Sequence, residues 1–109
     1  ERGRRRQLDA ISARLEELAS RGLPIIVAGD FNDWRQRATR ILEDRLGMTE
    51  VSIARHGRAA RTFPSALPML RLDRIYVRGL DIVSSRVHRG APWSLLSDHL
   101  AISAELRRA

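Results

Sequence analysis

The sequence contains no cysteine and no lysine, and its aromatic residues are two Phe, two Trp and one Tyr among 109 residues. The absence of cysteine excludes a disulfide framework and thiolate metal ligands. No apolar run approaches the roughly 18 residues that a membrane-spanning helix needs. No signal-peptide pattern opens the sequence, and the lack of cysteine is compatible with a reducing compartment, so we expect a cytoplasmic location.

All of the 20 basic residues are arginine, and with 13 acidic residues the formal net charge is +7. Genomic base composition explains this usage without any function, because arginine replaces lysine on most solvated surfaces. The functional alternative is an anionic partner: nucleic acid, a phospholipid surface or a phosphorylated small molecule. Arginine suits phosphate because its planar guanidinium donates two hydrogen bonds at once. Charge alone does not choose among these partners.

The patterning predicts one small α/β (α+β) domain, since 43% of the residues are apolar and helical and strand periodicities alternate. Apolar residues recur at helical spacing between residues 8 and 18, which predicts an amphipathic helix over 4–21. A short apolar run over 24–28 predicts a strand buried on both faces. The other expected elements are a helix over 36–46, a short strand over 49–53, a loop over 56–68, and strands over 71–77, over 80–87 and from 97 onward.

Three short motifs carry the candidate chemistry: Gly29-Asp30-Phe31-Asn32, Leu72-Asp73-Arg74-Ile75-Tyr76-Val77 and Ser97-Asp98-His99. Together they supply three aspartates, one asparagine and one histidine. These residue types hold a divalent cation and activate a water molecule against a phosphate. Asn32 lies two residues after Asp30, so in an extended backbone both side chains point to the same side.

Each motif also has a purely structural explanation. Asp30 and Asn32, directly after a strand, are typical of an Asx-turn or a helix cap. Asp73, inside an apolar strand, needs a partner, but the adjacent Arg74 points to the opposite face of that strand. Asp73 is therefore available to orient the ring of His99 and to keep it charged. The other two histidines, His56 and His88, lack such a context and are expected to be structural or solvated.

In this order after an apolar strand, the motifs resemble those of the endonuclease/exonuclease/phosphatase superfamily, the deoxyribonuclease I-like group of phosphoesterases. The resemblance covers essentially the whole chain. Trp34, Arg61-Thr62-Phe63-Pro64 and the strand with Asp73 are most similar to the small bacterial members. The resemblance implies a four-layer α/β/β/α sandwich with mixed, mostly antiparallel sheets and outer helices. It also implies hydrolysis of a phosphodiester or phosphomonoester with Mg²⁺ or Mn²⁺.

The resemblance further implies a role for each motif residue. Asp30 would orient or deprotonate the attacking water, and Asn32 would hydrogen-bond that water and the scissile phosphate. Asp98, together with Asp30, would hold or position the metal ion. His99 would contact the phosphate and stabilise charge in the transition state, while Asp73 holds its ring.

Trp34 and Arg35 follow the first motif and are candidate substrate contacts, as is Trp93; the alternative for each is packing or surface exposure. The expected substrate is a phosphate ester in nucleic acid or in a phospholipid head group, and the positive charge favours nucleic acid. We expect no stable protein partner. The alternative function is a non-catalytic basic module that binds nucleic acid or anionic lipid.

The sequence departs from the family's pattern because the first half of the domain, which carries the main metal-binding Glu in family members, is absent. Residues 1–109 therefore resemble the C-terminal half of the domain: one sheet, its outer helices and part of the site. We expect the missing N-terminal half to be needed to complete the site. The chain alone would then be weak or inactive, and it would expose one face of its sheet.

Overall fold

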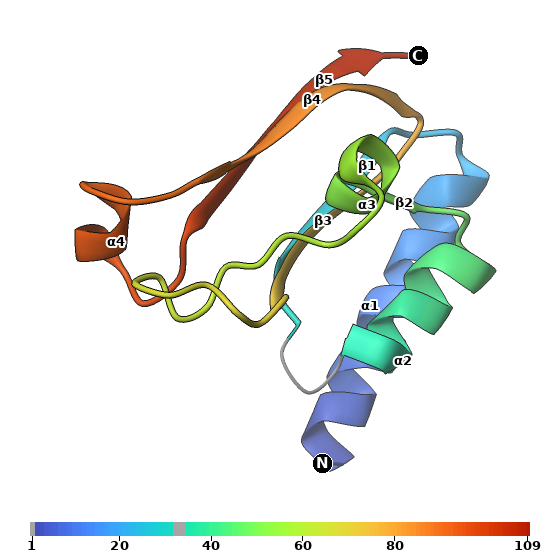
Figure 1. Ribbon diagram of the computed structural model, residues 1–109. Coiled ribbons are helices and arrows are strands. Elements are labelled where there is room, and N and C mark those ends of the chain that lie inside the picture. The colour runs from blue at the N-terminus through green and yellow to red at the C-terminus, as the bar shows by residue number, and fades with distance from the viewer. Residues whose placement is uncertain (1, 32–34) are drawn as a thin grey trace.

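The computed structural model describes residues 2–31 and 35–109, and within them the side chains of 9–31 and 37–109. Figure 1 shows the helices and strands, which are α1 (Arg2–Ser20), β1 (Ile25–Asp30), α2 (Arg35–Thr39), its π-helical continuation η2 (Arg40–Arg45), β2 (Thr49–Glu50), α3 (Val51–His56), β3 (Asp73–Arg78), β4 (Leu80–His88), α4 (Trp93–Leu96) and β5 (Ala101–Arg108). No helix in this part of the chain is long and apolar enough to cross a membrane.

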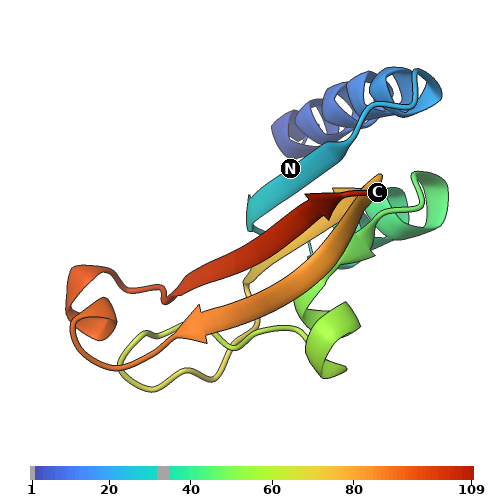
Figure 2. The same cartoon turned by 90° about the horizontal axis from the view of Figure 1, so that it is seen from above.

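The strands form two antiparallel sheets. In the first sheet β3 lies between β1 and β2, and in the second β4 pairs with β5. Gly79, at a φ of +75°, makes the tight connection from β3 to β4, a backbone conformation that favours glycine. In Figures 1 and 2 the β4–β5 ribbon extends away from the helices α1 and α2. The predicted α+β class is confirmed, and every pair of described strands is antiparallel.

The core lies between the helices α1, α2 and η2 and one face of the three-stranded sheet. Its buried residues are Leu15, Ile25, Ala38, Ile41, Leu42, Leu46, Met48 and Tyr76. The Tyr76 hydroxyl is satisfied inside this core by Thr39 Oγ1, at 3.0 Å. The helices cover one face only, since Ile25 is 6% exposed while the next residue, Ile26, is 55% exposed. The prediction that this strand is buried on both faces is therefore wrong for the chain. The expected open sheet face is present along β1 but not along all of β3, because Val77, the register partner of Ile26, is only 2% exposed.

The expected strand over 49–53 is mostly wrong, because β2 stops at Glu50 and the helix α3 follows at once. The side chain of Glu50 accepts hydrogen bonds from the backbone amides of Ser52, at 3.2 Å, and Ile53, at 3.0 Å. These bonds cap the first turn of α3. Gly57, at a φ of +80°, ends the helix in a left-handed conformation. The cap outweighs the β-branched residues that favoured a strand.

The last strand begins later than expected, at Ala101 rather than Ser97. The Ser97 hydroxyl accepts a hydrogen bond from the backbone amide of His99, at 3.2 Å, which holds a turn in place of extended backbone. The helix expected over 36–46 forms as α2 followed by η2. The helix expected over 4–21 and the strands over 71–77 and 80–87 match α1, β3 and β4 to within two residues.

Glu50 generates a stability prediction, because this buried carboxylate also faces the amide of Ile75 on β3, at 3.4 Å. Glu50→Ala removes the acceptor for three buried or half-buried amides and should lower the free energy of unfolding by about 1–3 kcal/mol. Urea denaturation of the complete protein that contains this chain measures the loss. Glu105→Ala, an exposed change on β5, is the matched control and should stay within about 0.5 kcal/mol of the parent. Equal effects of the two changes would contradict the capping role.

Candidate functional site

The first sheet places two carboxylates side by side. In the register of β1 and β3, Asp30 is the direct partner of Asp73. The pairing continues one step further, since the amide of Phe31 donates to the carbonyl of Leu72 at 2.8 Å. Because side chains alternate along a strand, both aspartates lie on the same face as the exposed Ile26. The two acidic groups therefore meet on the face that α1 and α2 leave uncovered.

The segment between α4 and β5 brings a histidine to this pair. The amide of Leu100 donates to the carbonyl of Thr62 at 2.8 Å, and the amide of Ser65 donates to the carbonyl of Asp98 at 2.6 Å. These two bonds tie the residues before β5 to the segment that precedes β3. His99 lies between the two tied positions, so its place is set by backbone hydrogen bonds on either side.

His99 reaches both aspartates. Its Nδ1 lies 2.6 Å from Asp73 Oδ2, and its Nε2 lies 3.7 Å from Asp30 Oδ2. The hydroxyl of the fully buried Thr62 donates to the same oxygen of Asp73. The ring of Phe63 packs against the imidazole, with 4.8 Å between ring centroids. The two nitrogens of one ring are thus held toward two different carboxylates.

The surroundings favour a charged imidazole. The pKa of His99 is raised, first by its hydrogen bond to Asp73 and further by the negative charges of Asp73, Asp30 and Asp98, while partial burial opposes the shift. With Nδ1–H donating to Asp73, the protonated ring keeps an Nε2–H donor on the side of Asp30. Such a donor can hydrogen-bond a phosphate oxygen or a developing negative charge.

The same three side chains have the composition of a partial metal site. One ligand atom from each of Asp30, Asp73 and His99 lies within 4.8 Å of the others. Asp73 Oδ2 already accepts hydrogen bonds from His99 and Thr62. Asp30 is the more accessible of the two carboxylates, because its side chain is 42% exposed against 21% for Asp73. Mg²⁺ is commonly bound by one or two carboxylates, waters and substrate phosphates, so this donor set fits it in part.

Other predicted site residues are not brought into this group. The side chain of Asp98 is exposed and is not one of the three clustered residues. It acts on the group only through its negative charge, which helps to raise the pKa of His99. Trp93 packs its ring against His88, with 4.8 Å between centroids. Asn32 and Trp34 lie outside the described residues, as does the side chain of Arg35, so their proposed roles stay predictions.

Sequence reasoning missed two supporting residues. Thr62 and Phe63 fall in the segment predicted only as a loop, yet they contact Asp73 and His99. The one available signal was the likeness of Arg61-Thr62-Phe63-Pro64 to the bacterial family members. The prediction that Asp73 pairs with His99 and not with the adjacent Arg74 is confirmed. The Arg74 guanidinium donates to the Tyr76 hydroxyl, at 3.5 Å, and Asp73 pairs with His99.

The chain belongs to the Endonuclease/Exonuclease/phosphatase family, whose model matches residues 1–99. Members are generally hydrolases that act on phosphate esters and use divalent metals. The chain is 45% identical over 103 residues to the uncharacterized protein YbhP of Escherichia coli (strain K12), covering 94% of this chain and 40% of that protein.

A more distant relative is a UPF0294 protein of Vibrio cholerae serotype O1 (strain ATCC 39315 / El Tor Inaba N16961). It is 36% identical over 98 residues, which cover 87% of this chain and 32% of that protein. The chain therefore spans well under half the length of the curated relatives it matches. No solved structure matches the chain.

The raised pKa of His99 can be tested directly. Asp73→Asn removes the hydrogen-bonded negative charge that is the main cause of the shift, so the pKa of His99 should fall. NMR titration of the imidazole in the complete protein measures it. Asp81→Asn, the same change at an exposed position on β4, should leave the pKa of His99 unchanged. An unchanged pKa in Asp73→Asn would contradict the assigned cause.

The sign of the linkage follows from that direction. Folding raises the pKa of His99, so protonation of this ring favours the folded state at pH values below the unfolded pKa, and the contribution is lost as pH rises through the folded pKa. In Asp73→Asn this part of the pH dependence of stability should shrink.

Proposed function

We propose that the complete protein containing this chain is a divalent-metal-dependent phosphoesterase, and that Asp30, Asp73 and His99 form part of its active site. The observation that supports this most is the 2.6 Å hydrogen bond from His99 to Asp73, with Asp30 on the other side of the ring. The chain's family consists generally of phosphate-ester hydrolases. A carboxylate-held imidazole beside a second carboxylate suits that chemistry.

In this proposal each residue has a distinct task. Asp73 fixes the tautomer and the orientation of the His99 ring through Nδ1. His99 donates from Nε2 to a phosphate oxygen and stabilises the charge that develops in the transition state. Asp30 orients the attacking water or takes its proton, a general-base contribution of about 10²- to 10⁴-fold. Thr62 holds the carboxylate of Asp73 in place by a hydrogen bond, and Phe63 packs against the imidazole of His99.

Mg²⁺ or Mn²⁺ would be held by Asp30, and Asp98 is a second candidate ligand. When bound, the ion would polarise the phosphate oxygens and lower the pKa of a water molecule. We expect further ligands from the part of the complete protein that this chain does not include. Asn32, Trp34 and Arg35 are proposed to contact the substrate, which is a phosphate ester of nucleic acid or of a phospholipid head group. No stable protein partner is proposed.

The experiment that tests this is phosphodiester hydrolysis by the complete protein, on plasmid DNA and on phospholipid vesicles, with Mg²⁺ or Mn²⁺ and then with EDTA. Asp30→Asn and His99→Gln should each lower turnover by about 10²-fold or more while the fold is retained. EDTA should abolish turnover.

The controls carry the same chemical changes elsewhere on the chain. Asp81→Asn and His88→Gln, both on β4, should retain the activity of the parent. Turnover that is indifferent to Asp30 and His99 would overturn the catalytic proposal. Salt-sensitive binding of DNA or vesicles without any turnover would favour the alternative, a non-catalytic basic module.

A further inference from the structure

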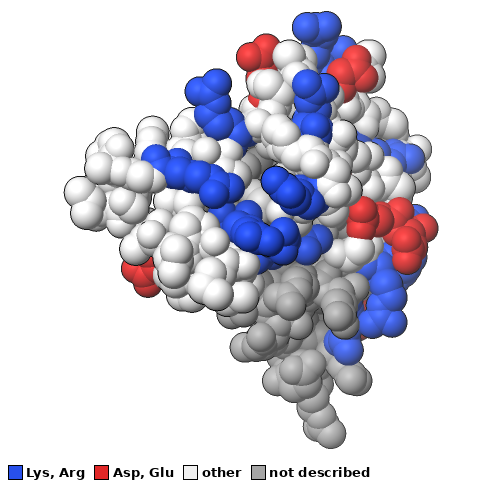
Figure 3. Space-filling model, in the orientation of Figure 1, with Lys and Arg blue, Asp and Glu red and all other residues white. Residues whose placement is uncertain are grey.

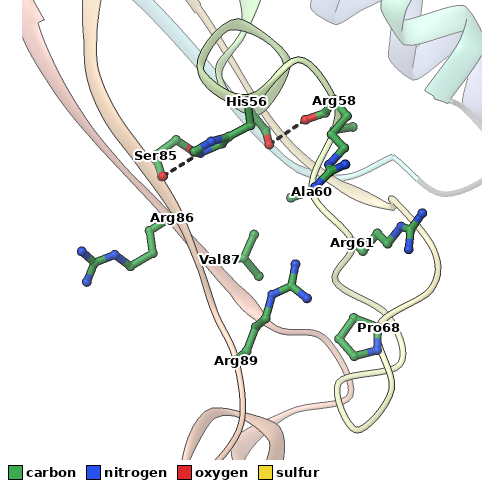
Figure 4. Close-up of a pocket in the computed structure, with 11 residues that line it drawn as sticks. His56, Arg58, Ala60, Arg61, Pro68, Ser85, Arg86, Val87 and Arg89 are labelled. Carbon is green, nitrogen blue, oxygen red and sulfur yellow. Dashed lines mark hydrogen bonds between the residues drawn. The ribbon is translucent and has the colours of Figure 1, made fainter.

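A hollow elsewhere in the molecule has a different chemistry from the Asp30, Asp73 and His99 group. Its volume is about 450 Å³, within the range of small-molecule sites. One wall consists of α3 and the segment that follows it, and the other wall is the strand β4 with the residue after it. Figure 4 shows these two walls, which come from distant parts of the sequence. Four arginines line the hollow, namely Arg58, Arg61, Arg86 and Arg89, and we call it the arginine hollow. The lining also contains His56 and no acidic residue.

The walls of the hollow are tied in place. His56 Nε2 hydrogen-bonds the carbonyl of Ser85 on β4, at 2.9 Å, which joins the two walls. The Ser52 hydroxyl donates to the carbonyl of Arg58, at 3.0 Å. The Arg71 guanidinium donates to the carbonyl of Ala59, also at 3.0 Å. These bonds hold the backbone on which the lining arginines sit, so the hollow is preformed rather than assembled by a ligand.

Like most described arginines, those of the hollow have no counter-ion, and what sets them apart is that they line one hollow. Arg14 pairs with Glu17, and Arg45 pairs with Glu16. Within the described part of the chain, the guanidinium groups of Arg58, Arg61, Arg86 and Arg89 make no ion pair and no hydrogen bond. Figure 3 shows a band of basic side chains across this view of the molecule, with no acidic side chains between them.

Gathering like charges around one hollow costs free energy that a bound anion would recover. In Figure 4 the Arg89 side chain points from the β4 side toward the wall that carries Arg58, while the side chains of Arg61 and Arg86 point away from the opposite wall. Guanidinium groups bind phosphate oxygens through paired hydrogen bonds, and a single phosphate would neutralise only part of this charge. The chemistry therefore matches a ligand with more than one phosphate.

We propose that the arginine hollow binds a small anion that carries two or more phosphate groups, of which inorganic pyrophosphate is the simplest. The hollow shares no lining residue with the Asp30, Asp73 and His99 group. It is nevertheless a close neighbour along the chain, since Arg61 immediately precedes the threonine that hydrogen-bonds Asp73. The inference concerns binding alone and stands whether or not the protein hydrolyses phosphate esters.

The test is calorimetric titration of the complete protein with inorganic pyrophosphate, in buffer freed of divalent ions on a chelating resin. The parent should bind one pyrophosphate in the hollow, and the double variant Arg58→Gln/Arg89→Gln, with one change on each wall, should bind at least about tenfold more weakly. Arg107→Gln/Arg108→Gln, at the exposed end of β5, makes the same change in net charge and should keep the parent affinity. Equal weakening in both doubles, or no binding by the parent, would overturn the proposal.

Two further arms locate the ligand and identify its source. Asp30→Asn should keep the parent affinity for pyrophosphate, and a loss there would place the anion at the proposed active site instead. A single-stranded oligonucleotide that binds through Arg58 and Arg89 where pyrophosphate does not would mean a polymer backbone, which overturns the small-anion assignment. Should the double variant fold poorly by circular dichroism, Arg89→Lys keeps the charge but loses the planar fork, and it should still weaken binding.

Discussion

The hydrogen bond between His99 Nδ1 and Asp73 Oδ2 joins segments that are far apart in the sequence. Asp73 opens β3 and is paired with Asp30 at the end of β1, while His99 precedes β5. Thr62 adds a third segment, because its hydroxyl donates to the same carboxylate oxygen. A half-buried carboxylate needs such partners to offset its desolvation. The geometry of the candidate site therefore depends on this one acceptor and on the groups that satisfy it.

The two aspartates of the site lie in different environments although they are direct neighbours across the sheet. Asp73 is the less exposed and is engaged by the imidazole and by Thr62, whereas Asp30 is more exposed and lies 3.7 Å from the other ring nitrogen. Neighbouring titratable groups in unlike environments are suited to different roles in one reaction.

The arginine hollow has the opposite charge to the two aspartates of the site. A group of two acids and one histidine lies close in the chain to a cluster of guanidinium groups that have no acidic partner among the described residues.

Much of the fold followed from periodicity. The amphipathic helix α1 and the strands β3 and β4 were predicted to within two residues, because their apolar spacing agrees with the tertiary packing. The helix α3 was missed because a single side chain decides it: Glu50 caps a sequence whose β-branched residues otherwise favour a strand. The apolar run of β1 wrongly predicted burial on both faces, because the exposure of Ile26 depends on which elements pack beside the strand. The open face was expected only from the resemblance, which implies a missing half of the domain.

The amino-acid sequence by itself determined which residue types are available, in which order, and on which local elements: an aspartate at the end of β1, an aspartate opening β3 and a histidine before the last strand. It also determined that Arg74 points away from Asp73, because alternation along a strand is a local property. Only the tertiary structure decided the register that pairs Asp30 with Asp73, the contact of Thr62 and Phe63 with the site, and the meeting of α3 with β4 around the arginine hollow. These are long-range contacts, and their energies come from packing and hydrogen bonds between segments whose approach no local pattern encodes.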